Sequence, residues 1–366
     1  MAVRSLPPGL EPIRRVVILR ANGIGDLVFS LPALWSIRRA YPEAEITLLA
    51  REWHCEFLAG RPAPVDRVVP LPPIPGVTAK EGDRCSADTR GEFVGDLRRE
   101  AIDLAVQLHG GGAFSNPFIC SLGARFTVGL QAPGAPPLDR SVAYVYYQPE
   151  ILRCLEVAAA AGAPATMLEP RLDVTPADLH EALALAPAQP FVVLHAGAGD
   201  PRRRWPPERF AEVARALLSN GLEVVVTGAG LEWQAAREVE QRAAGVTNVC
   251  GRLSLSGLAG LLSRAALVIS NDSGPLHLAE AVGTPTVGIY WCGNVINAGP
   301  ITRDRHRPLL SWRLECPVCS ANTISRRCEH DGSFVDLVSV AEVIEQARDL
   351  LQTARPAPMA APTGPV

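Results

Sequence analysis

Polar side chains gather between Ser270 and Ala281, directly after the apolar run Ala265–Ile269. An apolar strand that passes through a Gly-Pro turn into a helix leaves unpaired backbone N–H groups directed at one spot. Such a helix start attracts anions because its dipole is positive there. The candidate ligand residues of this segment are Asp272, Ser273, Gly274 and His277. The pattern predicts a site for a phosphorylated ligand.

A second turn of small and basic residues follows the apolar run Phe191–His195. Gly197 and Ala198 would let the backbone approach a diphosphate, and the arginines at 202–204 supply positive charge. A guanidinium group can hold two phosphate oxygens at once. A solvated arginine-rich loop that leads into a helix explains the same residues equally well.

Taken together, the two turns favour one shared ligand, because turns that follow strands of the same sheet would face the same nucleotide diphosphate. Glu232 follows the strand Glu223–Thr227 and could bind ribose hydroxyls, although an exposed helical glutamate is the commoner outcome. His277 could contact phosphate, and a histidine packed inside its helix is the alternative.

The N-terminal turn carries Asn22, Gly23, Gly25 and Asp26 directly after the strand that ends at Arg20. The dinucleotide fingerprint needs a third glycine where this chain has Val28. An NAD-linked oxidoreductase is therefore a weak alternative, supported only by Glu52 after the second strand. Asp26 could accept a proton from a sugar hydroxyl, whereas an isolated aspartate at a helix start more often caps the helix. Only a matching site in the other half of the chain would favour the base.

Two further groups of residues could carry chemistry. His109, followed by three glycines, is a candidate acceptor-side loop or only a tight turn. The last four candidates, Cys316, Cys319, Cys328 and His330, have the number and spacing of structural zinc ligands. Reduced, packed or redox-active thiols are the alternatives, and we expect catalysis not to depend on this cluster.

Strands and helices must alternate to position these residues. The expected strands are 15–20, 45–50, 102–108, 191–195, 223–227, 267–269 and 286–290, and the expected helices cover about 27–41 and 207–219. This order predicts two doubly wound parallel sheets, which imply a cleft between domains and ligands at the carboxyl ends of the strands. Residues 62–88 read as a long loop.

Length and composition limit the class of protein. A chain of 366 residues favours two domains, which we place at 12–175 and 185–352, joined by a Pro-rich linker near 168–189. Residues 355–366 read as a disordered tail. The net charge of −3 argues against a nucleic-acid partner, and 48% hydrophobic residues indicate a globular, enzyme-like protein.

The cellular setting follows from what the sequence lacks. We find no apolar run long enough to span a bilayer, no signal peptide and no secreted cysteine framework among the nine cysteines. These features predict a cytoplasmic protein, and they leave open peripheral contact with the inner face of a membrane.

In combination and order, three segments make the chain resemble glycosyltransferase family 9, typified by ADP-heptose–lipopolysaccharide heptosyltransferases. The resemblance runs from about Arg15 to Leu351 and rests on Val17–Leu34, His195–Pro206 and Asp272–Ala279. It implies two Rossmann-like domains of the GT-B type, with a nucleotide-sugar donor in the C-terminal domain and a lipid-linked or glycan acceptor in the N-terminal one. It also implies an inverting, metal-independent transfer that needs no cofactor.

The resemblance implies roles for single residues. Asp26 matches the general base, Ala198 matches a small position whose backbone faces phosphate, and the Asp272 segment matches the donor site. Arg203 stands where the family usually has lysine, in a chain whose one lysine is Lys80. Arginine keeps the charge and changes the geometry.

The segment 290–300 departs from the family pattern at a strand end where we expect it to line the donor site, which puts heptose itself in question. A member that binds sugar nucleotide without turnover is the remaining alternative, and the intact Asp26 argues against it.

Overall fold

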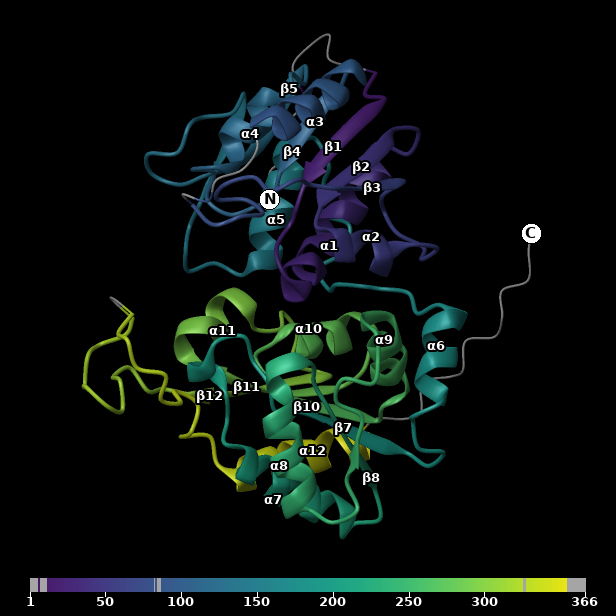
Figure 1. Cartoon of the computed structure of the whole chain (residues 1–366), viewed down its shortest axis with the longest axis vertical. Coiled ribbons are helices and arrows are strands. Elements are labelled where there is room, and N and C mark those ends of the chain that lie inside the picture. The colour runs from purple at the N-terminus through teal and green to yellow at the C-terminus, as the bar shows by residue number, and fades with distance from the viewer. Residues whose placement is uncertain (1–5, 7–11, 82, 84–86, 325–326, 354–366) are drawn as a thin grey trace. The chain divides into compact units, whose positions relative to one another are not determined.

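The computed structural model describes residues 6, 12–81, 83, 87–324 and 327–353 and divides into two compact units. The first unit comprises Met1–Leu179 with Asn294–Ile301, and the second comprises His180–Gly293 with Thr302–Val366. The tail expected at 355–366 lies outside the described residues. Figure 1 labels the elements of both units.

The first unit is built on a parallel sheet of six strands in the order β3-β2-β1-β4-β5-β6. The strands are β1 (Arg15–Leu19), β2 (Glu45–Ala50), β3 (Arg67–Pro70), β4 (Leu104–Gln107), β5 (Phe126–Gln131) and β6 (Arg140–Ala143). The helices between and after them are α1 (Ile24–Ala40), α2 (Glu52–Leu58), α3 (Ala87–Arg99), α4 (Ser115–Ser121) and α5 (Glu150–Ala160).

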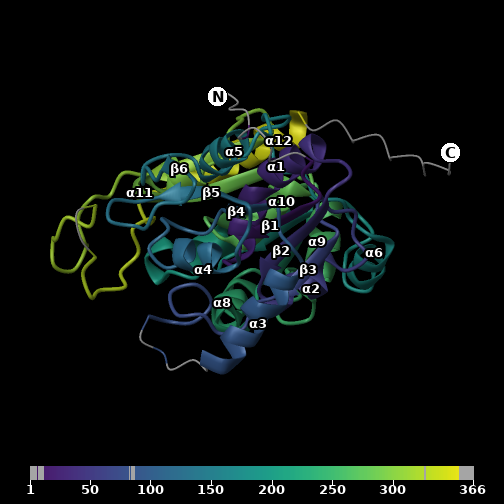
Figure 2. The ribbon, with the colours of Figure 1, turned by 90° about the horizontal axis from the view of Figure 1, so that it is seen from above.

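Helices cover both faces of this first sheet. Helices α1 and α5 pack against each other on one face, and α3 and α4 lie on the other (Figure 2). On the α3 and α4 face, Leu97 and Ile119 pack into one buried cluster with Val17 and Leu19 of β1. Because β1 and β4 are covered on both faces, they read as nearly continuous apolar runs.

The second unit repeats the same topology in the order β12-β11-β10-β7-β8-β9. Its strands are β7 (Phe191–His195), β8 (Glu223–Thr227), β9 (Thr247–Asn248), β10 (Leu267–Asn271), β11 (Thr286–Trp291) and β12 (His306–Ser311). Its helices are α7 (Pro207–Leu218), α8 (Trp233–Arg242), α9 (Leu255–Arg264), α10 (Gly274–Ala281) and α12 (Val340–Thr353), with the 3₁₀ turns η1 (Pro201–Arg203) and η2 (Gly230–Glu232). Two more helices, α6 (Pro176–Leu183) and α11 (Cys292–Ala298), cross the boundaries between the units.

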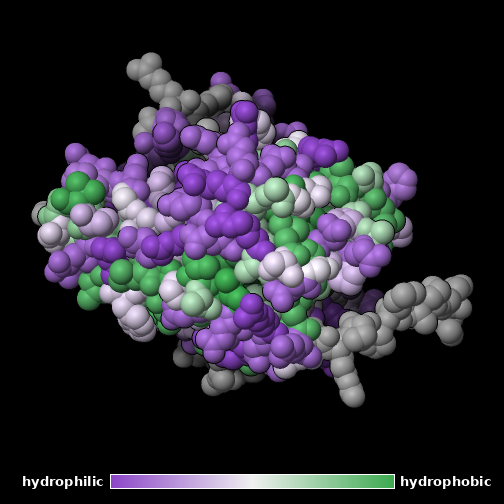
Figure 3. All heavy atoms as spheres, turned by 90° about the horizontal axis from the view of Figure 1, so that it is seen from below, coloured by the Kyte–Doolittle hydropathy of each residue, from purple (hydrophilic) through white to green (hydrophobic). Residues whose placement is uncertain are grey.

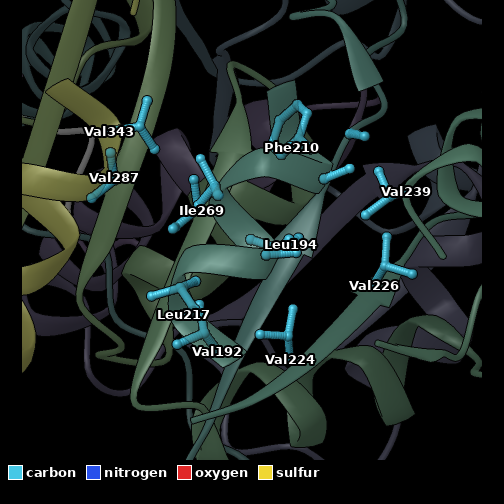
Figure 4. Close-up of a cluster of buried hydrophobic side chains, with 14 of the residues drawn as sticks. Val192, Leu194, Phe210, Leu217, Val224, Val226, Val239, Ile269, Val287 and Val343 are labelled. Atoms are coloured by element: carbon cyan, nitrogen blue, oxygen red, sulfur yellow. The ribbon is translucent and has the colours of Figure 1, made fainter. Parts of the chain in front are cut away.

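The core of the second unit fills the space between its sheet and helices α7, α8 and α12. Figure 4 shows Leu194 and valines of β7 and β8 among side chains of these helices, which include Phe210, Leu217, Val239 and Val343. All four of these helix residues are almost fully buried. Outside the core, hydrophilic and hydrophobic residues are interspersed over the face drawn in Figure 3.

Both sheets reverse their strand order at one point, between β1 and β4 in the first unit and between β7 and β10 in the second. Ligands of open parallel sheets bind beyond the carboxyl ends of the strands at such a point. Residues 20–26 and 108–112 follow the first pair of strands, and residues 196–205 and 272–277 follow the second. The predicted residues of these four segments therefore follow the strands at the reversal, whereas Glu232 follows β8 and the cysteine cluster follows β12.

The fold class is the predicted one, and two segments differ from the expectation. The loop expected at 62–88 contains the edge strand β3, too short for its pattern to show and closed by Pro70. The expected linker contains α6, whose Pro176 occupies the first turn of the helix, where no N–H is needed. In the described part of the chain, no helix combines the length and apolar character that a bilayer crossing requires.

Replacing Leu194 in the centre of β7 tests the core of the second unit. Leu194→Ala removes a fully buried side chain, so the free energy of unfolding should fall by about 2–5 kcal/mol. Urea unfolding measures the change. Leu183→Ala, at a position 55% exposed on α6, is the matched control and should change the free energy by less than about 0.5 kcal/mol. Equal losses in both variants would contradict this core.

Candidate functional site

The predicted donor residues of the second unit lie at the carboxyl ends of three adjacent strands. Gly197, Ala198 and Arg203 follow β7, Glu232 follows β8, and Asp272, Ser273, Gly274 and His277 follow β10. The structure joins them into two groups, one around Asp272 and one around Glu232.

Asp272 is the centre of the first group and is only 1% exposed. Arg203 Nη1 donates to its Oδ2 at 3.0 Å, and His277 Nε2 lies 3.1 Å from its Oδ1. Burial would raise the pKa of Asp272, yet the hydrogen bond from His277 and the charges of His277 and Arg203 lower it below its usual range. The carboxylate therefore stays ionised and is paired with two positively charged side chains, Arg203 and His277.

His277 also contacts a second carboxylate, which lies on α10. Its Nδ1 lies 3.3 Å from Glu280 Oε2, so both ring nitrogens have a carboxylate partner. Burial disfavours the charged imidazole, but the hydrogen bonds to Asp272 and Glu280 raise its pKa to about 9. A histidine protonated at neutral pH and 3% exposed is a fixed positive charge behind the site rather than a proton carrier.

The start of α10 offers fewer backbone donors than a standard helix. Pro275 has no N–H, and the N–H groups of Leu276 and His277 already bond to Ser273 O at 3.1 and 3.4 Å. Among the described residues, the backbone N–H groups of Ser273 and Gly274 have no acceptor. These two groups and the half-buried Arg203 can donate hydrogen bonds to an anion.

Asn271 fixes the loop that carries Arg203, a role that sequence reasoning missed. Its Nδ2 donates to Ala196 O at 2.9 Å and to Gly197 O at 3.2 Å, and its Oδ1 accepts from Trp205 N at 3.0 Å. Arg204 Nε closes the loop on Ala198 O at 2.8 Å. An asparagine at the end of a buried strand was the available signal, because its amide must find partners there.

The second group holds Glu232 against the β7 turn. Glu232 Oε2 accepts from Ala229 N at 2.9 Å, and Oε1 lies 3.4 Å from His195 Nε2. Burial would raise the pKa of Glu232, and the nearby His195 lowers it below the usual range. A Cβ atom at Gly197 would come within 2.0 Å of Glu232 Oε1, so any side chain there would displace the Glu232 carboxylate. Glu232 is thus an ionised acceptor at the predicted ribose position.

In the first unit, Asp26 lies in the first turn of α1 with its carboxylate held on both oxygens. Oδ2 accepts from Gly23 N at 3.0 Å, and Oδ1 accepts from Arg20 Nη2 at 3.1 Å. The side chain remains 40% exposed. Asp26 therefore caps the helix, as the simpler interpretation expected, and still presents a fixed, accessible carboxylate. Gly25 lies inside α1 rather than in the turn before it.

Arg20 is buried and connects Asp26 to a wider network. Besides Asp26, it donates to Glu150 Oε1 at 2.9 Å and to Leu108 O after β4. Glu150 in turn pairs with Arg153, which is also buried. Glu150 is 130 residues from Arg20 in the chain, and no sequence pattern signalled their pairing.

His109 and Asn22 lie beside this network. His109 Nδ1 accepts from Ala21 N at 3.2 Å, and burial, followed by the charge of Arg20, lowers the pKa of His109 to about 4. The neutral ring therefore carries its proton on Nε2, as a donor. Asn22 Oδ1 is buried without a hydrogen-bond partner among the described residues. Gly112 has a φ of +95°, and a Cβ there would meet Asn116 at 2.4 Å, so the predicted turn after His109 requires glycine.

The cysteine cluster is assembled as the sequence predicts. One ligand atom from each of Cys316, Cys319, Cys328 and His330 lies within 4.8 Å of the others. The cluster belongs to the loop between β12 and α12, and its residues make none of the contacts to Arg203, Asp272 or Glu232 described above.

The pKa of His277 predicts a pH-dependent stability. The folded-state pKa of about 9 lies above the ordinary 6.5, so the stabilisation is complete below about pH 6.5 and is lost as the pH rises to about 9. In thermal unfolding, wild type should therefore have a higher Tm than His277→Gln at low pH. This difference in Tm should narrow as the pH rises from about 6.5 to about 9.

His180 is an exposed histidine and provides the control. His180→Gln should follow wild type at every pH. If the difference in Tm between wild type and His277→Gln stays constant with pH, His277 is not the charged group described above.

Comparison with known proteins identifies the family of the chain. The family model "Glycosyltransferase family 9 (heptosyltransferase)" matches residues 90–323. Lipopolysaccharide heptosyltransferase 2 of Salmonella typhimurium is 25% identical over 321 residues, 81% of this chain and 85% of the relative.

Two solved structures share the fold. A glycosyl transferase family 9 protein from Veillonella parvula has a TM-score of 0.76 at 20% identity, covering 93% of this chain and 98% of that one. The E. coli ADP-heptose lps heptosyltransferase II has a TM-score of 0.71 at 22% identity, covering 93% and 99%. The family match covers more than half of the chain and assigns a transferase rather than an NAD-linked oxidoreductase. The protein belongs to glycosyltransferase family 9 and is a glycosyltransferase.

Proposed function

We propose that this glycosyltransferase moves heptose from ADP-heptose to a lipopolysaccharide core acceptor, with inversion at the anomeric carbon and Asp26 as general base. The names of the relatives support the donor and the acceptor. In this proposal the domain at 12–175 binds the acceptor and the domain at 185–352 binds the donor. The fixed and exposed carboxylate of Asp26 is the observation that carries the chemistry.

The donor diphosphate would bind over the start of α10. The free N–H groups of Ser273 and Gly274 can donate to its oxygens, and Arg203 supplies a full positive charge. Asp272 uses Arg203 Nη1, which leaves the other guanidinium donors for phosphate. The ionised Glu232 is placed to accept from ribose hydroxyls, and the small residues Gly197 and Ala198 allow the backbone to approach.

Asp26 would act on the acceptor hydroxyl. Arg20 and the Gly23 N–H hold the carboxylate in one orientation, so it need not reorganise when the proton moves. His109 Nε2–H and Asn22 Oδ1 are polar groups of the two turns that follow β4 and β1. We propose that they form hydrogen bonds that position the acceptor.

The transfer step is a single displacement. The acceptor oxygen attacks the anomeric carbon while Asp26 takes its proton, and the bond from that carbon to the diphosphate oxygen breaks on the opposite face. The electron pair leaves with ADP, whose growing negative charge is stabilised by Arg203 and the α10 backbone. The step needs no cofactor in this proposal, and protein groups take the place of a divalent cation at the diphosphate.

A lipopolysaccharide core acceptor would be lipid-linked, so we further propose a cytoplasmic enzyme that works peripherally at the inner face of the membrane. A nucleic-acid partner has no place in this function. The net charge of −3 gives no general attraction to polyanions.

Replacing Asp26 tests the base. Asp26→Asn keeps the shape and the cap acceptor but cannot take a proton, so kcat should fall by about 10²–10⁴-fold. Transfer from ADP-heptose to purified core acceptor measures kcat, and isothermal titration with ADP should give an unchanged Kd.

Glu52→Gln, at an exposed carboxylate of the same unit, is the matched control and should keep wild-type kcat. Wild-type turnover in Asp26→Asn would remove Asp26 from the mechanism. A wild-type protein that binds ADP-heptose without turnover would instead indicate a binding protein.

Replacing Arg203 tests the donor site. Arg203→Ala removes a charged donor from the diphosphate, so kcat/KM for the donor should fall by roughly 10–100-fold or more while the fold stays intact. Arg237→Ala, at an exposed arginine of α8, should behave like wild type. Unchanged kinetics in Arg203→Ala would exclude this residue from donor binding.

A further inference from the structure

The loop between β12 and α12 holds four metal-binding side chains in one place. Cys316, Cys319, Cys328 and His330, here called the cysteine knuckle, bring their ligand atoms within 4.8 Å of one another. A tetrahedral site with Zn–S bonds of about 2.3 Å needs ligand separations of about 3.8 Å. Small side-chain rotations would therefore close the knuckle around one ion.

The donor set favours zinc. Three thiolates and one imidazole form a Cys₃His set, a common structural zinc site with no open position. Softer sulfur ligands disfavour Mg²⁺ and Ca²⁺, which take oxygen ligands. His330 Nδ1 is also buried without a hydrogen-bond partner among the described residues, which is costly for a ring that has no other task.

The backbone of the knuckle is already folded around the first cysteine. Val318 N donates to Cys316 Sγ at 3.4 Å, and Ser320 N donates to Cys316 O at 2.9 Å. Cys316 N bonds to Ala321 O at 2.9 Å, which closes the turn. Ser320 adopts a φ of +56°, a left-handed conformation that a non-glycine residue keeps only where its surroundings impose it. This turn presents the first two cysteine sulfurs to the same point.

The segment that leaves the knuckle braces the loop of the donor site. Phe334 N donates to Arg202 O at 2.7 Å, and Ser333 Oγ donates to Arg204 O at 2.7 Å. These two contacts lie on either side of Arg203 in the chain. The guanidinium of Arg202 also lies 5.9 Å from the centre of the Phe334 ring. Residues 200–205, here called the arginine loop, are therefore hydrogen-bonded to residues 333–334 as well as to Asn271.

The segment that enters the knuckle from β12 is hydrogen-bonded to the sheet and to the segment that leaves it. Ser311, the last residue of β12, donates to Phe334 O, and Arg313 forms two hydrogen bonds with Asp336 at 3.0 and 3.1 Å. Trp291 Nε1 donates to Arg313 O at 2.6 Å. The knuckle thus lies at the tip of a loop whose two ends meet at residues 311–313 and 334–336.

We propose that Cys316, Cys319, Cys328 and His330 bind one Zn²⁺ and that this cross-link holds residues 333–336 against the arginine loop. Binding releases the protons of the three thiols to solvent and leaves the imidazole neutral. The zinc takes no part in glycosyl transfer and positions Arg203 through the backbone on either side of it. Because a metal cross-link shortens the free part of the loop, it lowers the entropy lost when residues 333–336 dock.

Metal content of the full-length protein tests the site. The protein is purified under reducing conditions, dialysed against metal-free buffer and analysed for zinc and iron by plasma mass spectrometry. We expect about one zinc per chain, and its loss in Cys319→Ser and Cys328→Ser. Cys120→Ser, at an exposed cysteine of α4, should keep its zinc. Zinc well below one per chain in wild type, iron in its place, or full zinc in both knuckle variants would overturn the proposal.

Hydrogen exchange tests the coupling without using enzyme activity. Amides at 200–205 and 333–336 should exchange faster in Cys319→Ser and in chelator-treated wild type, while amides of β7 and β8 keep their protection. Cys319 is exposed, so its serine variant should fold, and chelation of wild type covers the case in which it does not. Zinc loss that leaves exchange of the arginine loop unchanged would overturn the positioning role. Neither readout depends on the proposed sugar transfer, so the two proposals can fail separately.

Discussion

The ion pairs of the buried carboxylate of Asp272 are the interactions on which the proposed donor site depends. This carboxylate lies at the end of β10 and holds Arg203 from the β7 loop and His277 from α10. Removing a partner of a buried charge is destabilising because the remaining charge loses part of its compensation. Asp272 therefore makes the loop and the helix start adopt one arrangement, with Arg203 partly exposed and His277 hidden.

In the first unit, a buried charge also orients an accessible group of opposite sign, with the two signs reversed. There the buried group is a cation, Arg20, and it holds the accessible carboxylate of Asp26. Arg20 and Asp272 both follow strands that flank the reversal of strand order in their sheets. A buried charge at this point of each sheet orients one group that remains accessible, a carboxylate in one unit and a guanidinium in the other. That division matches what the proposed transfer needs, a base for the acceptor and positive charge for the leaving diphosphate.

Much of this organisation follows from local sequence signals. β2, β7 and β8 have the predicted bounds because apolar runs flanked by polar turns mark buried parallel strands clearly. The strand-to-helix turn around Asp272 could be predicted because strand, turn and helix signals are adjacent in the chain. Partners distant in the chain could not be predicted: Glu150 pairs with Arg20 and Asn271 bonds to the β7 loop only after the sheet has formed. Glu280 was the exception that could have been found, three residues after His277 on one helix.

A double-mutant cycle on ADP binding tests the role of Asp272 most directly. Isothermal titration would give the ADP affinity of wild type, Asp272→Asn, Arg203→Ala and the double variant, with circular dichroism to establish that each is folded. If Asp272 acts by holding Arg203, the single variant Asp272→Asn binds ADP more weakly than wild type does. The same substitution then has little further effect when Arg203 is already alanine. The coupling free energy between the two positions would be about 0.5–3 kcal/mol. Additive losses, or wild-type affinity in Asp272→Asn, would contradict the account.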